Sequence, residues 1–300
     1  MGVKKFITNK YYRKTEAAYI SFYLPALVLF LVFVVSPLFR AIFVSLTDWN
    51  GLSATYNFIG LQNYKTFLAD DYVHLSIAAT AKYTISVTIF QNLLALTLAL
   101  ALNNAFVGRN FFRAMFFTPA LMSSLVVGYV WSFLFSDPIM KFGRAVGWDL
   151  LARNVLSSKD FAIFAAAFVS VWRASGWTMM IYLAGLQSIP KELEEAAAID
   201  GAIYLQKLRY IILPLIAPSF TINFILVFER CLKDFDSIFA LTQGGPGSAT
   251  LVMAVNIYRE SFLYTRGSYG TTIGVVMFIM IVILTLIQLK YFRKREENVD

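Results

Sequence analysis

The chain alternates long apolar runs with short polar segments. A helix that rises about 1.5 Å per residue needs about 20 apolar residues to cross about 30 Å of hydrocarbon. Six runs reach that length: 19–46, 77–102, 114–135, 161–187, 213–238 and 270–291. The pattern predicts an all-α, polytopic membrane protein with six transmembrane helices, organised as a single transmembrane domain over residues 1–300.

The positive charges between these runs predict the orientation. Six spans place both termini on one side of the membrane. The segments on that side carry fourteen Lys and Arg residues, against seven on the other side. Because cytoplasmic loops are enriched in Lys and Arg, we expect the N-terminal segment 1–18, the loop 188–214 and the tail 292–300 to be cytoplasmic.

The composition agrees with a membrane protein. Hydrophobic residues make up 58% of the chain and charged residues only 15%, which lies outside the usual range of soluble domains. The net charge of +8 comes mainly from the loops, so no nucleic-acid partner is predicted. One cysteine, Cys231, and one histidine, His74, leave no internal disulfide and no metal site to expect.

The loop 188–214 has a helical pattern of its own. Ser188 can cap a helix that Asp200 and Gly201 end. Asp200 can then cap a second short helix. Pro214 follows this helix and begins the next span. These helices carry more apolar side chains than a solvated loop needs, at Leu193, Ala196, Ala197, Leu205 and Leu208. We therefore expect another protein to cover this face.

The spacing of residues in this loop resembles the EAA loop of ABC importer permeases. The matching positions are Glu195-Ala196-Ala197, Gly201 after three more residues, Ile211 after nine more, and Leu213-Pro214 after one more. In that family the loop forms a coupling helix that inserts into a groove on the cytoplasmic ATPase. The resemblance implies the type I importer permease fold. It also implies a set of coupling residues: Glu195, Ala196, Ala197, Asp200, Gly201, Ile211, Leu213 and Pro214.

Further stretches resemble the carbohydrate branch of these permeases, which handles maltose, lactose, multiple sugars and glycerol phosphate: 45–49, 113–119, 183–190, 235–236 and 241–246. The resemblance implies a second homologous permease subunit, two cytoplasmic ABC ATPase subunits and an extracellular or periplasmic solute-binding protein. It also implies a sugar substrate and a bacterial or archaeal cytoplasmic membrane. The chain has no GxxxxGK(S/T) phosphate-binding loop, so ATP and Mg²⁺ are expected on the ATPase subunits. This chain is expected to be a non-catalytic transport subunit without a cofactor.

Charged side chains inside the spans point to a water-filled cavity, because such groups are costly unless they face water or a partner. Arg173 lies near the middle of the fourth span, with Trp177 one turn further on the same face. Aromatic rings pack on sugars, and a guanidinium binds hydroxyls or carboxylates. We therefore expect both residues to bind substrate, with Arg230, Lys233 and Asp234 of the fifth span as further candidates. The cations suggest an acidic or strongly polar oligosaccharide, such as one that contains uronic acid.

Other interpretations of these residues stay open. Glu229 with Lys233, and Arg230 with Asp234, are spaced four residues apart and can form structural ion pairs. Trp172 and Trp177, on either side of Arg173, can serve lipid or helix packing. The carboxylates Glu229 and Asp234 can also serve an ion-gradient-driven secondary transporter. A membrane-embedded enzyme lacks support, since no nucleophile–base pair, metal ligand set or nucleotide loop is present in the sequence.

Overall fold

The computed structural model of the chain describes residues 19, 22–149 and 151–296, with side chains up to Phe292. The predicted N-terminal segment 1–18 and the last residues of the tail lie outside this range. The described residues are helical apart from connecting loops and one isolated bridge between Thr47 and Phe58, as the all-α prediction requires. In chain order the α-helices (α) and the 3-10 or π turns (η) are η1 (Leu31–Val35), α2 (Ser36–Val44), α3 (Gln62–Ala69), α4 (Asp71–Asn103), α5 (Arg109–Phe117), η2 (Thr118–Leu121), α6 (Ser124–Ser136), α7 (Pro138–Val146), η3 (Val155–Ser157), α8 (Ala162–Gln187), α9 (Lys191–Ile199), α10 (Tyr204–Lys207), η4 (Leu208–Ile212), α11 (Leu213–Leu215), α12 (Ala217–Leu232), α13 (Asp236–Thr242), α14 (Met253–Tyr258), η5 (Arg259–Leu263) and α15 (Gly267–Glu296).

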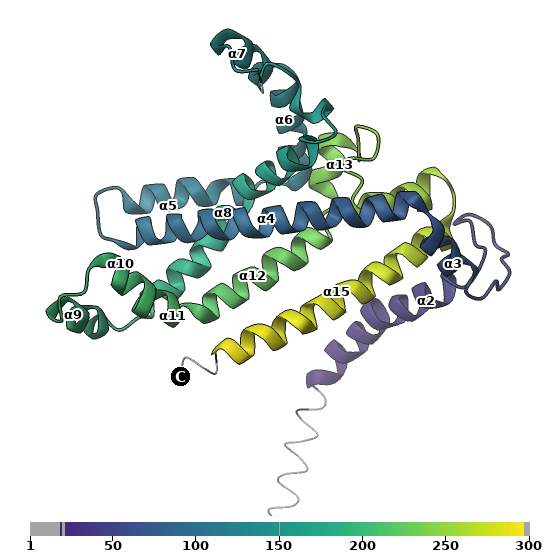
Figure 1. Ribbon diagram of the computed structural model, residues 1–300. Helices are drawn as coiled ribbons and strands as arrows, with labels where there is room; N and C mark the ends of the chain where they lie inside the picture. Colours follow the sequence, from purple (N-terminus) through teal and green to yellow (C-terminus); the bar gives the residue numbers. More distant parts are fainter. Residues whose placement is uncertain (1–18, 20–21, 150, 297–300) are drawn as a thin grey trace, which may run out of the picture.

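Helices α4, α8 and α12 form the centre of the molecule. α4 packs along α8, and α12 lies against both of them. The buried side of α8 is rich in small residues such as Ala162, Ala166 and Ala174, which let two helix backbones approach closely. α15 lies next to α12, and α2 lies next to α15 (Figure 1). The central helices therefore carry most of the contacts that position the interior.

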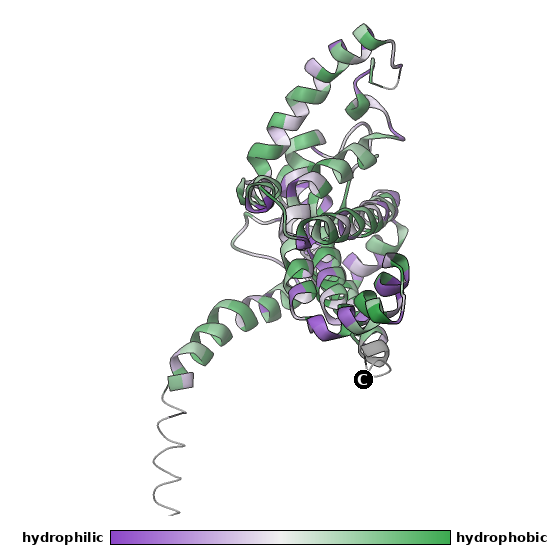
Figure 2. Cartoon of the chain, turned by 90° about the vertical axis from the view of Figure 1, so that its left-hand side faces the viewer, coloured by the Kyte–Doolittle hydropathy of each residue, from purple (hydrophilic) through white to green (hydrophobic). Residues whose placement is uncertain are grey.

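The middle of α4 buries polar side chains and exposes apolar ones. α4 buries Thr88, Gln91 and Asn92 against its neighbours, whereas Phe90 and Leu93 of the same helix are exposed. Apolar residues predominate along the helices in Figure 2. An apolar outer surface with polar side chains turned inward suits a chain surrounded by lipid, because lipid cannot hydrogen-bond to polar side chains.

Four helices of the described residues are long and apolar enough to cross a membrane: Phe22–Val44, Asp71–Asn103, Ser124–Val146 and Gly267–Phe292. Tyr204–Leu215 and Ala217–Leu232, bent by 67° relative to each other, make a fifth if they count as one span. α8 has 26 residues, enough to cross about 30 Å. Arg173 and several polar neighbours make its composition less apolar than that of the other five.

Two predicted spans are wrong as continuous helices. The run 114–135 is interrupted after α5, where the chain turns through η2 and becomes extended at Met122 before α6 begins. Pro119 has no N–H to donate, and its ring crowds the preceding turn, which breaks the helix. The run 213–238 is interrupted after Leu232, because Asp234 Oδ1 accepts a hydrogen bond from the Ser237 N–H at 3.3 Å and starts α13 instead.

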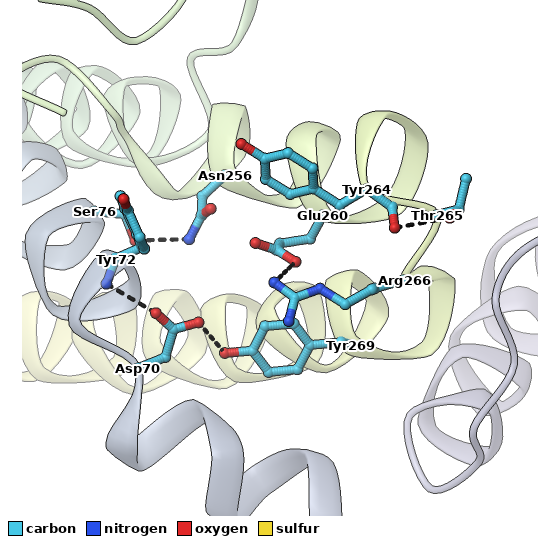
Figure 3. A network of polar contacts seen from close by, with 9 residues as sticks. All are labelled: Asp70, Tyr72, Ser76, Asn256, Glu260, Tyr264, Thr265, Arg266 and Tyr269. Atoms are coloured by element: carbon cyan, nitrogen blue, oxygen red, sulfur yellow. Dashed lines mark hydrogen bonds and ion pairs between the residues drawn. The ribbon is translucent and has the colours of Figure 1, made fainter. Parts of the chain in front are cut away.

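A polar network ties the start of α4 to η5 and α15 at the end of the bundle near α3 (Figure 3). Tyr269 donates its hydroxyl hydrogen to Asp70 Oδ2 at 2.7 Å. The buried carboxylate of Glu260 forms an ion pair with Arg266, whose guanidinium lies 5.0 Å from the Tyr269 ring centroid. Burial raises the pKa of Glu260, which the charge of Arg266 partly opposes. These contacts fix the connection between the two helices at that end.

The opposite end of the bundle holds α9, α10 and α11, and the C-terminal end of α15 lies on the same side (Figure 1). Phe292 packs against Phe220 and Phe224 of α12, with ring centroids 6.4 and 5.2 Å apart. The end of the last helix therefore packs on the helix that follows the loop 188–214.

A central cavity and an exposed helical loop as candidate functional sites

A cavity of about 730 Å³ opens between α4, α8, α12 and the α12–α13 connection. Its polar and charged lining residues are Gln91, Ser124, Arg173, Trp177, Thr178, Asn223, Glu229, Arg230, Lys233, Asp234 and Asp236. The structure thus brings together all five residues predicted to bind substrate. Three of the charged groups are cationic and three are acidic, so the lining is balanced in charge rather than basic.

Arg173 and Trp177 project from α8 into this cavity. They lie four residues apart, which places them on one face of the helix. Within the described residues, Nε of Arg173 is buried without a hydrogen-bond partner. Trp177 is 58% exposed and stacks on Phe117, with ring centroids 6.0 Å apart. An aromatic face and an unsatisfied guanidinium donor are therefore adjacent in one cavity.

Trp172 has a different role. Its ring meets Trp131 edge to face at a centroid distance of 5.4 Å, and it does not belong to the cavity lining. For this residue the packing interpretation is confirmed. Trp172 and Trp177 are five residues apart on α8, and at about 100° per residue they point about 140° away from each other around the helix.

The predicted pairing of Arg230 with Asp234 is wrong. Arg230 donates from Nη2 to Gln91 Oε1 at 2.7 Å and from Nη1 to Ser170 Oγ at 3.2 Å. Asp234 accepts a hydrogen bond from the hydroxyl of Tyr83 at 2.5 Å. The helix ends at Leu232, so Asp234 no longer lies one helical turn beyond Arg230. Both charges instead join α12 and its end to α4 and α8.

The other predicted pair is present. Lys233 Nζ lies 2.5 Å from Glu229 Oε1 in the cavity lining, and both side chains are partly exposed. Exposed pairs of this spacing stabilise a helix by about 0.5 kcal/mol or less. Lys233 therefore occupies the cavity with its charge already compensated, unlike Arg173.

Uncharged polar residues that were not predicted complete the cavity wall. Gln91 donates from Nε2 to Thr178 Oγ1 at 2.6 Å, and Asn223 donates from Nδ2 to the Thr178 carbonyl oxygen at 3.1 Å. Nearby, the Tyr182 hydroxyl donates to Asn92 Oδ1 at 2.7 Å. The sequence did contain a signal for these residues: an amide side chain inside an apolar run needs a hydrogen-bond partner when it is buried in a dry interior.

The exposed loop lies where α8 ends. α9 ends at Ile199, and Gly201 follows with a φ of +78°, the left-handed conformation that favours glycine. Ile211 belongs to η4, and Leu213 and Pro214 belong to α11. Glu195 and Ala196 are exposed, Ala197 is half-buried, and Leu205 is 69% exposed. The predicted helix–break–helix pattern is present, with a large apolar surface on it.

Both predicted caps of this loop are wrong. The Ser188 hydroxyl donates to the Gly185 carbonyl oxygen at 2.8 Å and so belongs to the end of α8. Asp200 follows the last residue of α9, and the second helix starts at Tyr204, after Ile203. There the side-chain oxygen of Gln206 accepts a hydrogen bond from the Ile203 N–H at 2.8 Å. The bend at Gly201 separates Asp200 from the second helix, which explains why it cannot cap it.

An apolar helical bundle, a polar cavity in its centre and a loop with exposed apolar side chains at the end of a cavity helix together define a membrane permease. Residues 91–298 match the family described as the binding-protein-dependent transport system inner membrane component. The chain belongs to this family.

Two relatives cover nearly the whole chain. It is 35% identical to the multiple sugar-binding transport system permease protein MsmF of Streptococcus mutans, over 99% of this chain and 100% of that protein. It is 34% identical to the probable starch degradation products transport system permease protein AmyD of Thermoanaerobacterium thermosulfurigenes, over 92% and 94% of the two chains. The predicted place in the carbohydrate branch of ABC importer permeases is confirmed.

A solved structure shares the fold. It is that of a bacterial alginate ABC transporter in complex with an alginate pentasaccharide-bound periplasmic protein, with a TM-score of 0.82 and 20% sequence identity over 94% of this chain and 96% of that chain. At this identity the likeness concerns the path of the backbone. It supports the helical arrangement described above.

Proposed function

We propose that this chain is one permease subunit of an ATP-driven, binding-protein-dependent importer of a sugar or oligosaccharide. It pairs with a second homologous permease subunit, two cytoplasmic ATPase subunits that hold ATP and Mg²⁺, and an extracellular or periplasmic solute-binding protein. It crosses the cytoplasmic membrane six times, with α8 as one of the spans and both termini in the cytoplasm. The cavity alternates between outward and inward access.

The observation that carries the proposal is the cavity face of α8. Trp177 offers an aromatic surface on which the apolar face of a sugar ring packs. Arg173 offers guanidinium donors within one helical turn of it, and Nε is unsatisfied. A volume of about 730 Å³ lies in the range of pockets that enclose small ligands.

The charges of the cavity refine the choice of sugar. Arg230 and Asp234 are held by Gln91 and Tyr83, and Lys233 is held by Glu229. Arg173 is therefore the position at which a substrate carboxylate binds in our proposal, by charge-assisted hydrogen bonds. The balanced lining favours a substrate with many hydroxyl groups and few charges, so a uronate would bind through this one residue.

The exposed loop supports coupling to an ATPase. α8 carries the cavity residues and leads, within three residues of its end, into α9. A motion of α9 on a partner therefore reaches Arg173 and Trp177 through one continuous helix. We assign the partner contact to the surface around Glu195 and Ala196, and the bend to Gly201, with Ile211, Leu213 and Pro214 joining it to α12.

Uptake of labelled oligosaccharides into cells that contain the complete transporter tests the cavity assignment. Trp177→Leu should abolish uptake at unchanged membrane levels. Trp172→Leu, the same change on the same helix but outside the cavity, should retain most of it. Equal effects of the two changes would remove Trp177 from the site.

Two further measurements separate the alternatives. Arg173→Leu should reduce uptake of an acidic oligosaccharide more than that of its neutral analogue, and an equal reduction would refute the carboxylate assignment. Depletion of ATP should stop uptake in the wild type. Uptake that continues without ATP and stops when the ion gradient collapses would instead establish a secondary transporter.

A further inference from the structure

The outer surface of the bundle has a second hollow, on the side of α8 that faces away from the cavity. Its apolar part measures about 550 Å³ and lies between Phe90, Leu93 and Leu94 of α4 and Phe164, Phe168 and Val171 of α8. A second part of about 370 Å³ adjoins it and is lined by Lys82, Lys159 and Asp160. Phe164 lines both parts, so they are neighbours along α8, and we call the two together the groove: its first part is mainly apolar, and its second part holds the charged residues.

We propose that this groove binds one anionic glycerophospholipid, with an acyl chain between α4 and α8 and its phosphate at Lys82 and Lys159. The α4 side of the groove follows a single helix face, because Lys82, Ser86, Phe90, Leu93 and Thr97 recur every three or four residues. Ser86 and Thr97 are eleven residues apart, a rise of about 16 Å. That length matches one leaflet of a hydrocarbon core about 30 Å thick.

The depth of Lys82 agrees with this assignment. About 20 residues of α4 separate it from Leu102, near the far end of the helix, which is the length needed to cross the hydrocarbon. Lys82 thus lies at the level of the lipid headgroups, in the outer leaflet under the topology proposed above. Long basic side chains at this level extend toward anionic headgroups.

The charge of the hollow fits a phosphodiester. Neither Lys82 nor Lys159 forms an ion pair with a carboxylate among the residues that the structure describes. Asp160 is the acidic residue of the lining, so the three side chains together carry one net positive charge. Lys159 lies beside Gly247, since its Cε is 3.7 Å from the place that a Cβ on Gly247 would take. A phosphodiester with one negative charge compensates this excess, whereas an apolar helix would leave the one excess positive charge without a counter-charge.

The consequence concerns the cavity wall. Arg173 and Trp177 lie on one face of α8, and Phe164 and Phe168 lie about 140–180° around the same helix. A lipid in the groove therefore supports from outside the helix that carries the proposed sugar site. Lipid binding is measured separately from transport, so a failure of this proposal and a failure of the proposed function are distinguishable.

The experiment uses the full-length chain in nanodiscs of phosphatidylcholine with a minor fraction of phosphatidylglycerol, and retained lipid is counted by native mass spectrometry after release. Wild type should retain phosphatidylglycerol selectively. The double variant Lys82→Ala, Lys159→Ala should lose that preference about twenty-five-fold, from about fivefold for each lysine. Lys65→Ala, a lysine of α3 outside the groove, should behave like wild type.

A second variant and a cross-linking arm keep the test decisive. Leu93→Trp fills the apolar part and should reduce retention of both lipids while leaving the lysines in place. Unchanged selectivity of the double lysine variant would overturn the proposal. In the cross-linking arm, a photo-reactive residue replaces Leu94 in the assembled transporter. Capture of a segment of another protein chain instead of lipid would also overturn the proposal.

Discussion

Gly176 lies where α8 closely approaches the backbone at the end of α5. A Cβ at this position would lie 2.1 Å from the Phe116 carbonyl oxygen and 2.7 Å from the Phe117 Cα. Ordinary contacts of such an atom begin at 3.4 Å. Gly176→Ala therefore forces the end of α5 outward by about 1.3 Å, because the obstructing atoms belong to the backbone and cannot rotate away.

The expected loss of stability follows from two opposing effects. Overpacking of a close contact costs about 1–3 kcal/mol, whereas alanine in place of glycine within a helix gains about 0.5–1 kcal/mol. The net destabilisation should be about 1–2 kcal/mol, a fall in Tm of roughly 3–6 °C. Phe117 stacks on Trp177, so the same displacement should also lower sugar uptake.

Gly274→Ala in α15 is the matched control. The nearest atom to its added Cβ is Ile257 Cδ1 at 3.9 Å, so the added methyl group meets no clash. This variant should gain the stability that alanine gives over glycine in a helix, and its Tm should stay the same or rise. Thermal unfolding of both variants in the same detergent measures the difference. A Gly176→Ala protein as stable as Gly274→Ala would refute the close approach of α8 to the end of α5.

Three further predictions concern the loop, the polar network near α3 and the cavity wall. Gly201→Val should abolish uptake at normal membrane levels while Gly201→Asn retains most of it, because open space surrounds the residue and only its φ of +78° disfavours a side chain, least so for asparagine. Arg266→Ala should lower the free energy of unfolding by about 1–3 kcal/mol at pH 7.5. The loss should shrink as the pH falls to 5, because the raised pKa of buried Glu260 rises further without the cation and the folded state then binds the proton more readily than the unfolded chain. Gln91→Leu should cost about 2–4 kcal/mol in thermal unfolding, because Nη2 of Arg230 loses its acceptor and only the bond from Nη1 to Ser170 remains, and Gln91→Glu should restore much of it.

Sequence patterns located the second and last membrane helices well, since α4 and α15 contain the apolar runs 77–102 and 270–291. They missed the interruptions after Phe117 and Leu232. An apolar run reports how favourable burial is along a segment, but one proline or one carboxylate that bonds its own backbone decides whether the helix continues. Whether the helix continues thus depends on a single residue, which changes the mean hydropathy of the run very little.

The sequence by itself determined that this is a helical membrane protein with an EAA-type loop, and it brought Arg173 and Trp177 onto one helix face. Only the tertiary structure decided which charges are free. Gln91 and Arg230 are 139 residues apart, and Tyr83 and Asp234 are 151 apart, so no spacing rule links them. Hydrophobic segments can be recognised from composition alone. The partner of a buried charge instead depends on which polar group the packing of distant helices places within about 3 Å of it.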